Sequence, residues 1–252
     1  MADEPSNLDS EAISGLTIEP HWGKADYPYF LTRTQTKYSR IPLVEFLNQR
    51  GIENRLLESL VEHLPKGAFI AGGFMTSVMQ EQKAEGDIDL FFTGEEPFKE
   101  TMKLLAEPPD EDSAWAFRGY RLETGDKGIL FENGKGLRYV KYVHDKRPPI
   151  QLIKLVWYES SEHVIDSFDF TVAQFATDGE DLVFNPIGIL DLARKRLVLH
   201  RMQFPSSTLR RMIKYSKKGY YACPGSLARI AEETTKHLTR YPDENGKMVY
   251  VD

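Results

Sequence analysis

The 252-residue sequence has very little of several features that mark particular classes of protein. It contains one cysteine, Cys223, which excludes an internal disulfide and fits a reducing compartment. Its six histidines show no zinc-binding spacing. No apolar run approaches the ~18 residues that a membrane span needs, and the N-terminus is acidic, unlike a signal peptide. We therefore expect a soluble, cytoplasmic protein with no membrane partner.

Basic residues are also fewer than acidic residues, which gives a formal net charge of -6. A protein that coats nucleic acid uniformly is usually basic, so any nucleic-acid surface here must be local. Hydrophobic residues make up 41% of the chain, enough for the core of one large or two small domains. We predict a flexible acidic tail at 1–20, a core with an aromatic-rich N-terminal arm at 21–180, and a mostly helical, basic region at 181–252.

Helical and strand-like patterns alternate along the first two thirds of the chain, which predicts an α+β (mixed α/β) fold. The helices are expected at 42–50, 52–64, 74–82, 96–106 and 161–167. The strands are expected at 68–71, 87–92, 115–122, 128–132, 137–143, 150–157 and 168–176. The last third should contain helices at 186–196, 205–218 and 226–238 and a short strand at 197–202. Pro205 suits the first turn of its helix and Gly219 the C-terminal cap.

Two consecutive glycines, Gly72 and Gly73, stand between a predicted strand and a predicted helix. Glycine lets the backbone turn sharply there and approach a ligand closely. The unpaired N–H groups at a helix start form a natural cradle for phosphate oxygens. We therefore expect Gly72 and Gly73 to bind phosphate, with a hydroxyl contributed by Thr76 or Ser77. A tight turn without a ligand is the alternative.

Asp87 and Asp89 lie two residues apart on the next predicted strand, so both carboxylates should point to one face, roughly 6–7 Å apart along the chain. Ile88 and Leu90 would point to the opposite face, into the core. Two carboxylates beside a phosphate cradle can hold two Mg²⁺ (or Mn²⁺) ions about 3.5–4 Å apart. Such ions activate an attacking hydroxyl and neutralise a triphosphate. The alternative is the solvent-exposed face of a half-buried strand.

The combination resembles the signature of the DNA polymerase β superfamily of nucleotidyltransferases, in which a glycine pair opens a helix and an acid-x-acid strand follows. Here thirteen residues separate Gly72-Gly73 from Asp87-Ile88-Asp89-Leu90. CCA-adding enzymes and poly(A) polymerases share this pattern. The resemblance implies a polymerase β-like core, an NTP substrate, and Asp87 and Asp89 as metal ligands.

Two later segments extend the resemblance more loosely. The stretch from Phe168 to Gln174 and the stretch from Arg210 to Tyr220 resemble nucleotidyltransferase-like proteins of phages and large DNA viruses. A viral origin would place the protein in the host cytoplasm.

The superfamily normally supplies a third carboxylate from a neighbouring strand, and this sequence departs from that pattern. In the strand expected at 150–157, Gln151 stands roughly where an acid belongs. Gln can neither carry the charge nor take a proton at neutral pH, which puts full activity in question. Asp169 is the preferred substitute, because a carboxylate between two phenylalanines is costly to bury unless it binds something. A purely structural cap or ion pair is the alternative for Asp169, and Asp166 is the second choice.

The sequence from Leu192 to Lys218 contains no acid and nine basic residues: Arg194, Lys195, Arg196, Arg201, Arg210, Arg211, Lys214, Lys217 and Lys218. On the predicted helix at 205–218, Leu209, Met212, Ile213 and Tyr215 should pack inward. We expect the basic 194–218 segment to bind the phosphates of an NTP or of a nucleic-acid acceptor, mainly through Arg210, Arg211 and Lys214. A solvated face that balances the acidic N-terminus is the alternative.

These features predict a metal-dependent nucleotidyltransferase that moves a nucleoside monophosphate from an NTP to a hydroxyl, with an RNA end as the favoured acceptor. Asp87, Asp89 and Asp169 would be catalytic. A catalytically degenerate fold that binds nucleic acid or protein is the second hypothesis. A third, an enzyme akin to aminoglycoside nucleotidyltransferases, would need an acidic acceptor pocket. A third acid close to Asp87 and Asp89 would separate the first hypothesis from the second.

Overall fold

A computed structural model describes residues 18–19, 30–31, 38–82, 86–123, 129–131, 137–202 and 204–240. The acidic tail expected at 1–20 and most of the aromatic-rich arm at the start of the core lie outside these residues. Each helix within the described ranges is too short or too polar to serve as a membrane span.

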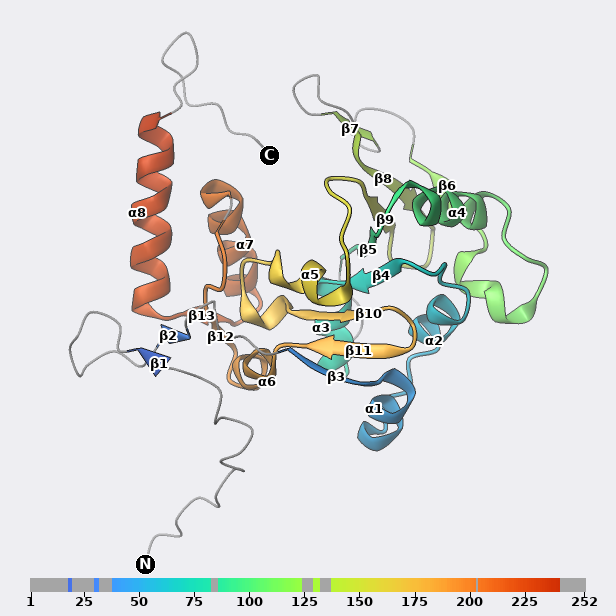
Figure 1. Ribbon diagram of the computed structural model, residues 1–252, viewed down its shortest axis with the longest axis horizontal. Helices are drawn as coiled ribbons and strands as arrows, with labels where there is room; N and C mark the ends of the chain where they lie inside the picture. Colours follow the sequence, from blue (N-terminus) through green and yellow to red (C-terminus); the bar gives the residue numbers. More distant parts are fainter. Residues whose placement is uncertain are drawn as a thin grey trace, which may run out of the picture.

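A nine-stranded sheet forms the centre of the molecule (Figure 1). Its strands lie in the order β3 (Ser39–Pro42), β11 (Asp181–Phe184), β10 (Phe175–Thr177), β4 (Ala68–Ala71), β5 (Ile88–Phe92), β9 (Ile150–Ile153), β8 (Leu137–Val143) and β6 (Arg121–Leu122), with β7 (Ile129–Phe131) paired to β8. Strands β5 and β9 are parallel, and the other pairs are antiparallel. The sheet and its helices confirm the predicted α+β class.

The two faces of the sheet are covered differently. One face packs against four helices: α1 (Leu43–Arg50), α2 (Arg55–Glu62), α3 (Gly73–Met79) and α4 (Glu95–Ala106). The other face carries a smaller apolar cluster beneath α5 (Ser161–Asp166). In β5, Ile88 and Leu90 are fully buried in the larger cluster, whereas Phe91 belongs to the smaller one. This alternation directs Asp89 to the face that the four helices leave open, as the sequence predicted.

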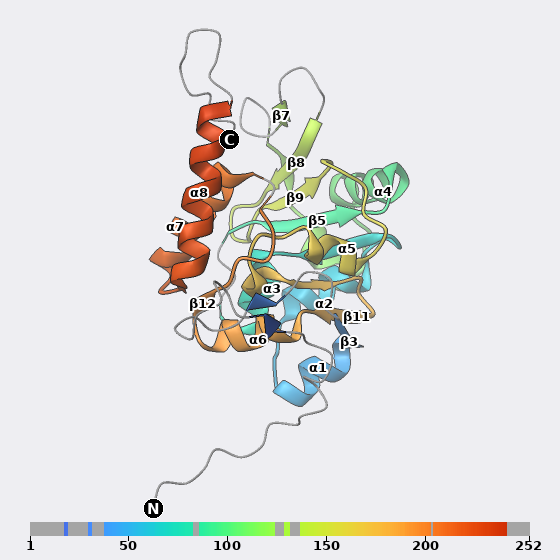
Figure 2. The same cartoon turned by 60° about the vertical axis from the view of Figure 1, so that its left-hand side comes forward.

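The C-terminal region adds α6 (Pro186–Ala193), α7 (Pro205–Lys217), α8 (Pro224–Arg240) and a small parallel pair, β12 (Arg196–Leu197) with β13 (Tyr221–Ala222). Helices α7 and α8 lie side by side at one edge of the molecule (Figures 1 and 2). Pro205 occupies the first turn of α7, and Gly219, at φ 83°, follows the helix, which confirms both predicted ends. The division between core and basic region near residue 180 stays a prediction.

Four predicted strands differ from the structure, and the one expected at 197–202 is reduced to β12 (Arg196–Leu197). The stretch expected at 115–122 is a 3₁₀ helix, η4 (Asp112–Phe117), followed by the two residues of β6. Its apolar residues pack on α2, and the Ala116 N–H donates to Ser59 Oγ at 3.2 Å, so tertiary contacts override the strand-like alternation. The strand expected at 150–157 ends at Ile153. The strand expected at 168–176 is largely replaced by a 3₁₀ turn, η5 (Thr171–Ala173).

Candidate functional site

The glycine turn and the carboxylate pair meet where β4 and β5 lie side by side. Ala71 pairs with Asp89, so the turn at Gly72 begins directly beside that carboxylate. Gly72 adopts φ 78° and ψ -143°, a conformation that favours glycine. A Cβ atom on Gly72 would lie 3.3 Å from Asp89 Oδ2. Both the turn and the close approach therefore require glycine at this position.

Asp87 is held by two side chains from the neighbouring strands. Gln151 Nε2 donates to Asp87 Oδ2 at 2.5 Å, and Lys141 Nζ lies 3.4 Å from Asp87 Oδ1. Gln151 stands directly beside Asp89 on β9, and Lys141 stands beside Gln151 on β8. The amide of Gln151 thus stands next to Asp89, at the neighbouring-strand position where the resemblance implied an acid. Lys141 was not predicted, because its place depends on the β8–β9 register, which side-chain patterns specify only weakly.

Asp89 sits in an environment that disfavours its charged form. Burial, and then the repulsion from Asp87, raise the pKa of Asp89 to about 7. The positive charges of Lys214, Arg211 and Lys141 act in the opposite direction but do not cancel the rise. A bound cation would stabilise the charged form of this carboxyl, because its positive charge offsets both the lost hydration and the repulsion from Asp87.

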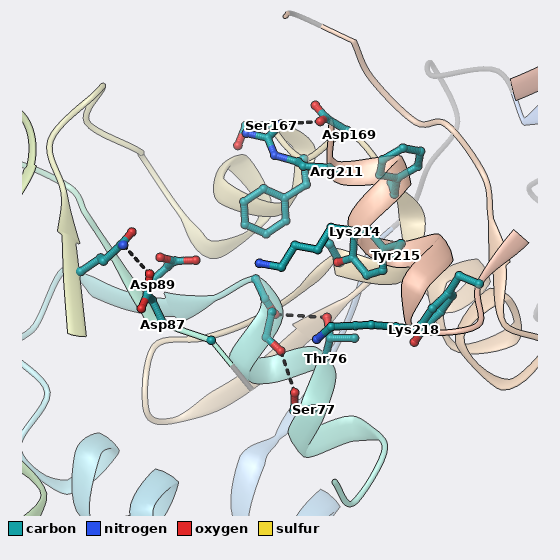
Figure 3. Close-up of a pocket in the computed structure, with 18 of the residues that line it drawn as sticks. Thr76, Ser77, Asp87, Asp89, Ser167, Asp169, Arg211, Lys214, Tyr215 and Lys218 are labelled. Carbon is teal, nitrogen blue, oxygen red and sulfur yellow. Dashed lines mark hydrogen bonds and ion pairs between the residues drawn. The ribbon is translucent and has the colours of Figure 1, made fainter. Parts of the chain in front are cut away.

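A cavity of about 700 Å³ separates the carboxylate pair from α7 (Figure 3). Arg211, Lys214, Tyr215 and Lys218 line it at successive turns of the helix, and Lys195 and Lys217 add two further cations. Lys214 extends from α7 toward the two carboxylates (Figure 3). Burial raises the pKa of Tyr215 to about 12, so its phenol keeps its proton at neutral pH.

The orientation of α7 differs in part from the expected one. Arg210, a predicted phosphate ligand, is exposed and is not among the residues that line the cavity. Ile213, expected to pack inward, is 49% exposed. Tyr215 faces the cavity and also packs against Phe170 and Tyr220. The helix pattern located the basic helix but not the side that faces the site.

Asp169 also lines the cavity, but on the side of α7. It is 6% exposed and forms an ion pair with Arg211 (Figure 3). Within the residues that the structure describes, no group of three His, Cys, Asp or Glu side chains is placed to hold a metal ion. Asp169 therefore forms no three-carboxylate cluster with Asp87 and Asp89. Asp166, the second choice, accepts hydrogen bonds from Tyr38 and Arg201 away from the cavity lining.

The hydroxyls expected to help bind phosphate already have acceptors. Thr76 Oγ1 lies 3.1 Å from the carbonyl oxygens of Gly72 and of Val172, and Ser77 Oγ donates to Gly73 O at 3.1 Å. A phosphate oxygen needs a donor, and each hydroxyl has a single hydrogen to donate. The backbone N–H groups of the turn are therefore the stronger candidates for phosphate contact on this side.

Aromatic side chains form an apolar surface beside the carboxylates. Phe91 packs against Phe168 and Tyr158, with ring centroids 5.7 and 5.5 Å apart, respectively. All three residues line the cavity. The cavity thus brings together an acidic side, a cationic side and an aromatic surface.

Solved structures of CCA-adding enzymes are similar to this fold. A complex of a CCA-adding enzyme with ATP superposes with a TM-score of 0.53 and 14% identity, covering 80% of this chain and 48% of that chain. The Thermotoga maritima CCA-adding enzyme complexed with tRNA gives a TM-score of 0.50 and 15% identity, covering 80% and 47%. Identities this low show the fold alone, which is that of the nucleotidyltransferases.

Sequence comparison shows the family to which this chain belongs. Gabija anti-defense 2 of Bacillus phage SPbetaL7 is 28% identical over 177 residues, which are 69% of this chain and 39% of that protein. This chain therefore spans well under half the length of that relative. The Gabija anti-defense 2 family matches residues 21–195, more than half of this chain. The protein belongs to the Gabija anti-defense 2 family.

Proposed function

We propose that the protein is a metal-dependent nucleotidyltransferase that transfers a nucleoside monophosphate from an NTP to a hydroxyl group. The observation that carries this proposal is the carboxylate pair Asp87 and Asp89 facing the cations of α7 across one cavity. In the reaction, the acceptor oxygen forms a bond to the α-phosphorus, the bond to the β-phosphate oxygen breaks, and pyrophosphate leaves. The hydroxyl proton is released.

The cavity has room and chemistry for an NTP. Its volume of about 700 Å³ is in the range of small-molecule sites. Arg211 and Lys214 are placed to contact the triphosphate from α7, because guanidinium and ammonium groups bind phosphate strongly. Gly72 and Gly73 line the cavity on the other side, where the N–H groups of the turn can donate to phosphate oxygens. Phe168 offers a π surface on which a nucleobase can stack.

The donor set at the carboxylates fits Mg²⁺ (or Mn²⁺). Asp87 and Asp89 supply carboxylate oxygens, and Mg²⁺ is commonly bound by one or two carboxylates together with substrate phosphates. When bound, the ion would stabilise the charge that develops on the phosphoryl oxygens. The protein's own contribution is to hold the NTP and the acceptor in line and to neutralise the departing pyrophosphate from α7.

For the acceptor we favour a nucleic-acid end, in particular RNA. The basic segment continues beyond the cavity at Arg210, so charge for a polyanion lies next to the site. One structural neighbour is complexed with tRNA, which is compatible with such an acceptor. The family name further suggests that the reaction acts against the Gabija defence system, in the host cytoplasm.

Incubation of the full chain with each labelled NTP, Mg²⁺ or Mn²⁺, and total RNA tests the proposal. We expect label in RNA with the wild type and none with Asp87→Ala or Asp89→Ala. Both variants should stay folded, because Asp87 and Asp89 face the cavity rather than the core. Label in the protein itself would identify a protein hydroxyl as the acceptor. No label in any acceptor would contradict the enzyme.

One observation favours a second candidate, a nucleotide- or nucleic-acid-binding protein without transferase activity. Gln151 and Lys141 contact Asp87 on the side where a further acid would stand in an active enzyme. Under this hypothesis the protein binds an NTP or RNA in the same cavity and leaves it unchanged. Binding measured by calorimetry, together with complete absence of label transfer, would identify this candidate.

A further inference from the structure

We propose that this site works with one divalent cation, and that the ammonium group of Lys141 takes the place of a second. The inference rests on the proposed function for the presence of a metal and a nucleotide. It assigns Lys141, on β8, as a positioning residue that acts through Asp87.

The strand register places four residues in one row across the sheet. Ala71, Asp89, Gln151 and Lys141 are consecutive partners across β4, β5, β9 and β8. Partners that stand directly opposite in adjacent strands point to the same face of a sheet. The row thus runs from the glycine turn through a carboxylate and an amide to an ammonium group. No acid stands on either strand position beyond Asp89.

Asp87 is already paired with a positively charged side chain of the protein. Lys141 Nζ lies 3.4 Å from Asp87 Oδ1 and 3.5 Å from Asp87 Oδ2, so it faces both oxygens of this carboxylate. Gln151 Nε2 donates to Oδ2. The Lys141 side chain is 22% exposed and that of Asp87 is 29% exposed, so solvent screens this pair only in part. One of the two carboxylates therefore already has a positive partner from the protein.

Asp89 differs from Asp87 in this respect. The described residues show no hydrogen bond or ion pair to the Asp89 carboxylate, although it lies at the inner end of the same row. A divalent cation held by Asp89 and Asp87 would neutralise Asp89 and leave one positive charge to face the phosphates of the nucleotide. A second dication on the far side of Asp87 would be repelled by Lys141 and would lack a third carboxylate.

Counting bound metal ions tests this inference independently of catalysis. The full chain is saturated with a non-hydrolysable NTP analogue and titrated with Mn²⁺, and protein-bound Mn²⁺ is counted by electron paramagnetic resonance after separation of free ions. We expect one Mn²⁺ per chain in the wild type. The double variant Lys141→Ala/Gln151→Asp restores a third carboxylate without its cation, and we expect two.

Lys141→Ala alone gives a result whose sign is informative. If Lys141 occupies the place of a cation, its removal should raise the affinity for Mn²⁺ about tenfold, because Asp87 loses its protein partner. If Lys141 only supports the structure, its removal should lower that affinity or leave it unchanged, which would overturn the inference. Lys103→Ala, at an exposed lysine on α4, serves as the matched control and should leave Mn²⁺ binding unaltered.

The remaining outcomes separate this inference from the proposed function. Two Mn²⁺ ions in the wild type, both lost in Asp89→Asn, would overturn the role of Lys141 and leave the transferase proposal intact. No bound Mn²⁺ beyond that carried by the free nucleotide would overturn both.

Discussion

Asp89 occupies a position that costs the folded state stability, as is common for residues that act on a ligand. Its pKa of about 7 lies well above the ~3.9 of an aspartate in an unfolded chain. Between these two values the folded chain keeps a proton that the unfolded chain has released. Stability therefore falls as pH rises through this window, and the full cost is present above pH 7.

Asp89→Asn should remove that cost, because an amide cannot ionise. We expect the variant to unfold at a temperature about 2–6 °C higher than the wild type at pH 8, and with a much smaller gain at pH 5. Thermal unfolding of both proteins in chelator, from pH 5 to pH 8, measures the difference. An equal difference at both pH values would show that the charge on Asp89 carries no such cost.

The two glycines of the turn should respond differently to the same substitution. Gly72→Ala places a Cβ atom at a positive φ and 3.3 Å from Asp89 Oδ2, so we expect a loss of about 1–3 kcal/mol in the free energy of unfolding. Gly73→Ala is the control, because its Cβ would meet nothing within 4 Å and its φ is not positive. Denaturant unfolding of the two variants gives the comparison, and equal losses would contradict this reading of the turn.

At the scale of single elements, α7 should bind the NTP through one side only. Lys214→Ala should weaken binding of an NTP analogue about tenfold or more and reduce its salt dependence, because Lys214 lines the cavity. Arg210→Ala is the matched control on the same helix. It should leave NTP binding unchanged, since Arg210 is not part of the lining.

Titration by fluorescence or calorimetry at two salt concentrations measures both variants. Equal effects of Lys214→Ala and Arg210→Ala would mean that α7 acts through its overall charge. Arg211→Ala is less suitable for this comparison, because it would leave the buried carboxylate of Asp169 without its ionic partner and so disturb the fold.

Local sequence patterns were sufficient to predict those elements whose conformation depends on a few neighbouring residues. The Gly72-Gly73 turn, the alternation in β5, and the Pro205 and Gly219 limits of α7 depend on backbone preferences and periodicity over a few residues. The prediction of a strand at 115–122 was wrong, because contacts with α2, more than fifty residues earlier, determine the conformation of this segment. The side of α7 that faces the site was also missed, because it depends on how the helix packs.

The candidate site shows the same division. Asp87 and Asp89 could be named from spacing, and Gln151 from its place in a neighbouring strand. The ion pair of Asp169 with Arg211 joins segments forty-two residues apart, and sequence reasoning left this pairing open. Lys141 required the register between two strands, which side-chain patterns on a two-sided strand specify weakly.

At the scale of the whole molecule, the larger buried cluster joins the sheet, which carries the two carboxylates, to the C-terminal region, which carries the cations of α7. Apolar residues of the sheet, such as Leu90 and Leu152, belong to the same buried cluster as Leu199 and Ile230 of the C-terminal region. Tyr220 also donates to Gln80 Oε1 at 3.0 Å, which joins the segment after α7 to the end of α3. The carboxylates and the cations of α7 are therefore held at a set separation before a ligand binds.

A crystal structure of the full chain with Mn²⁺ and a non-hydrolysable NTP analogue tests the central claim most directly, because anomalous scattering locates the metal. We predict Mn²⁺ bound by Asp87 and Asp89, with the triphosphate between the Gly72-Gly73 turn and Lys214. A nucleotide bound elsewhere, or no Mn²⁺ at the two carboxylates, would contradict the account.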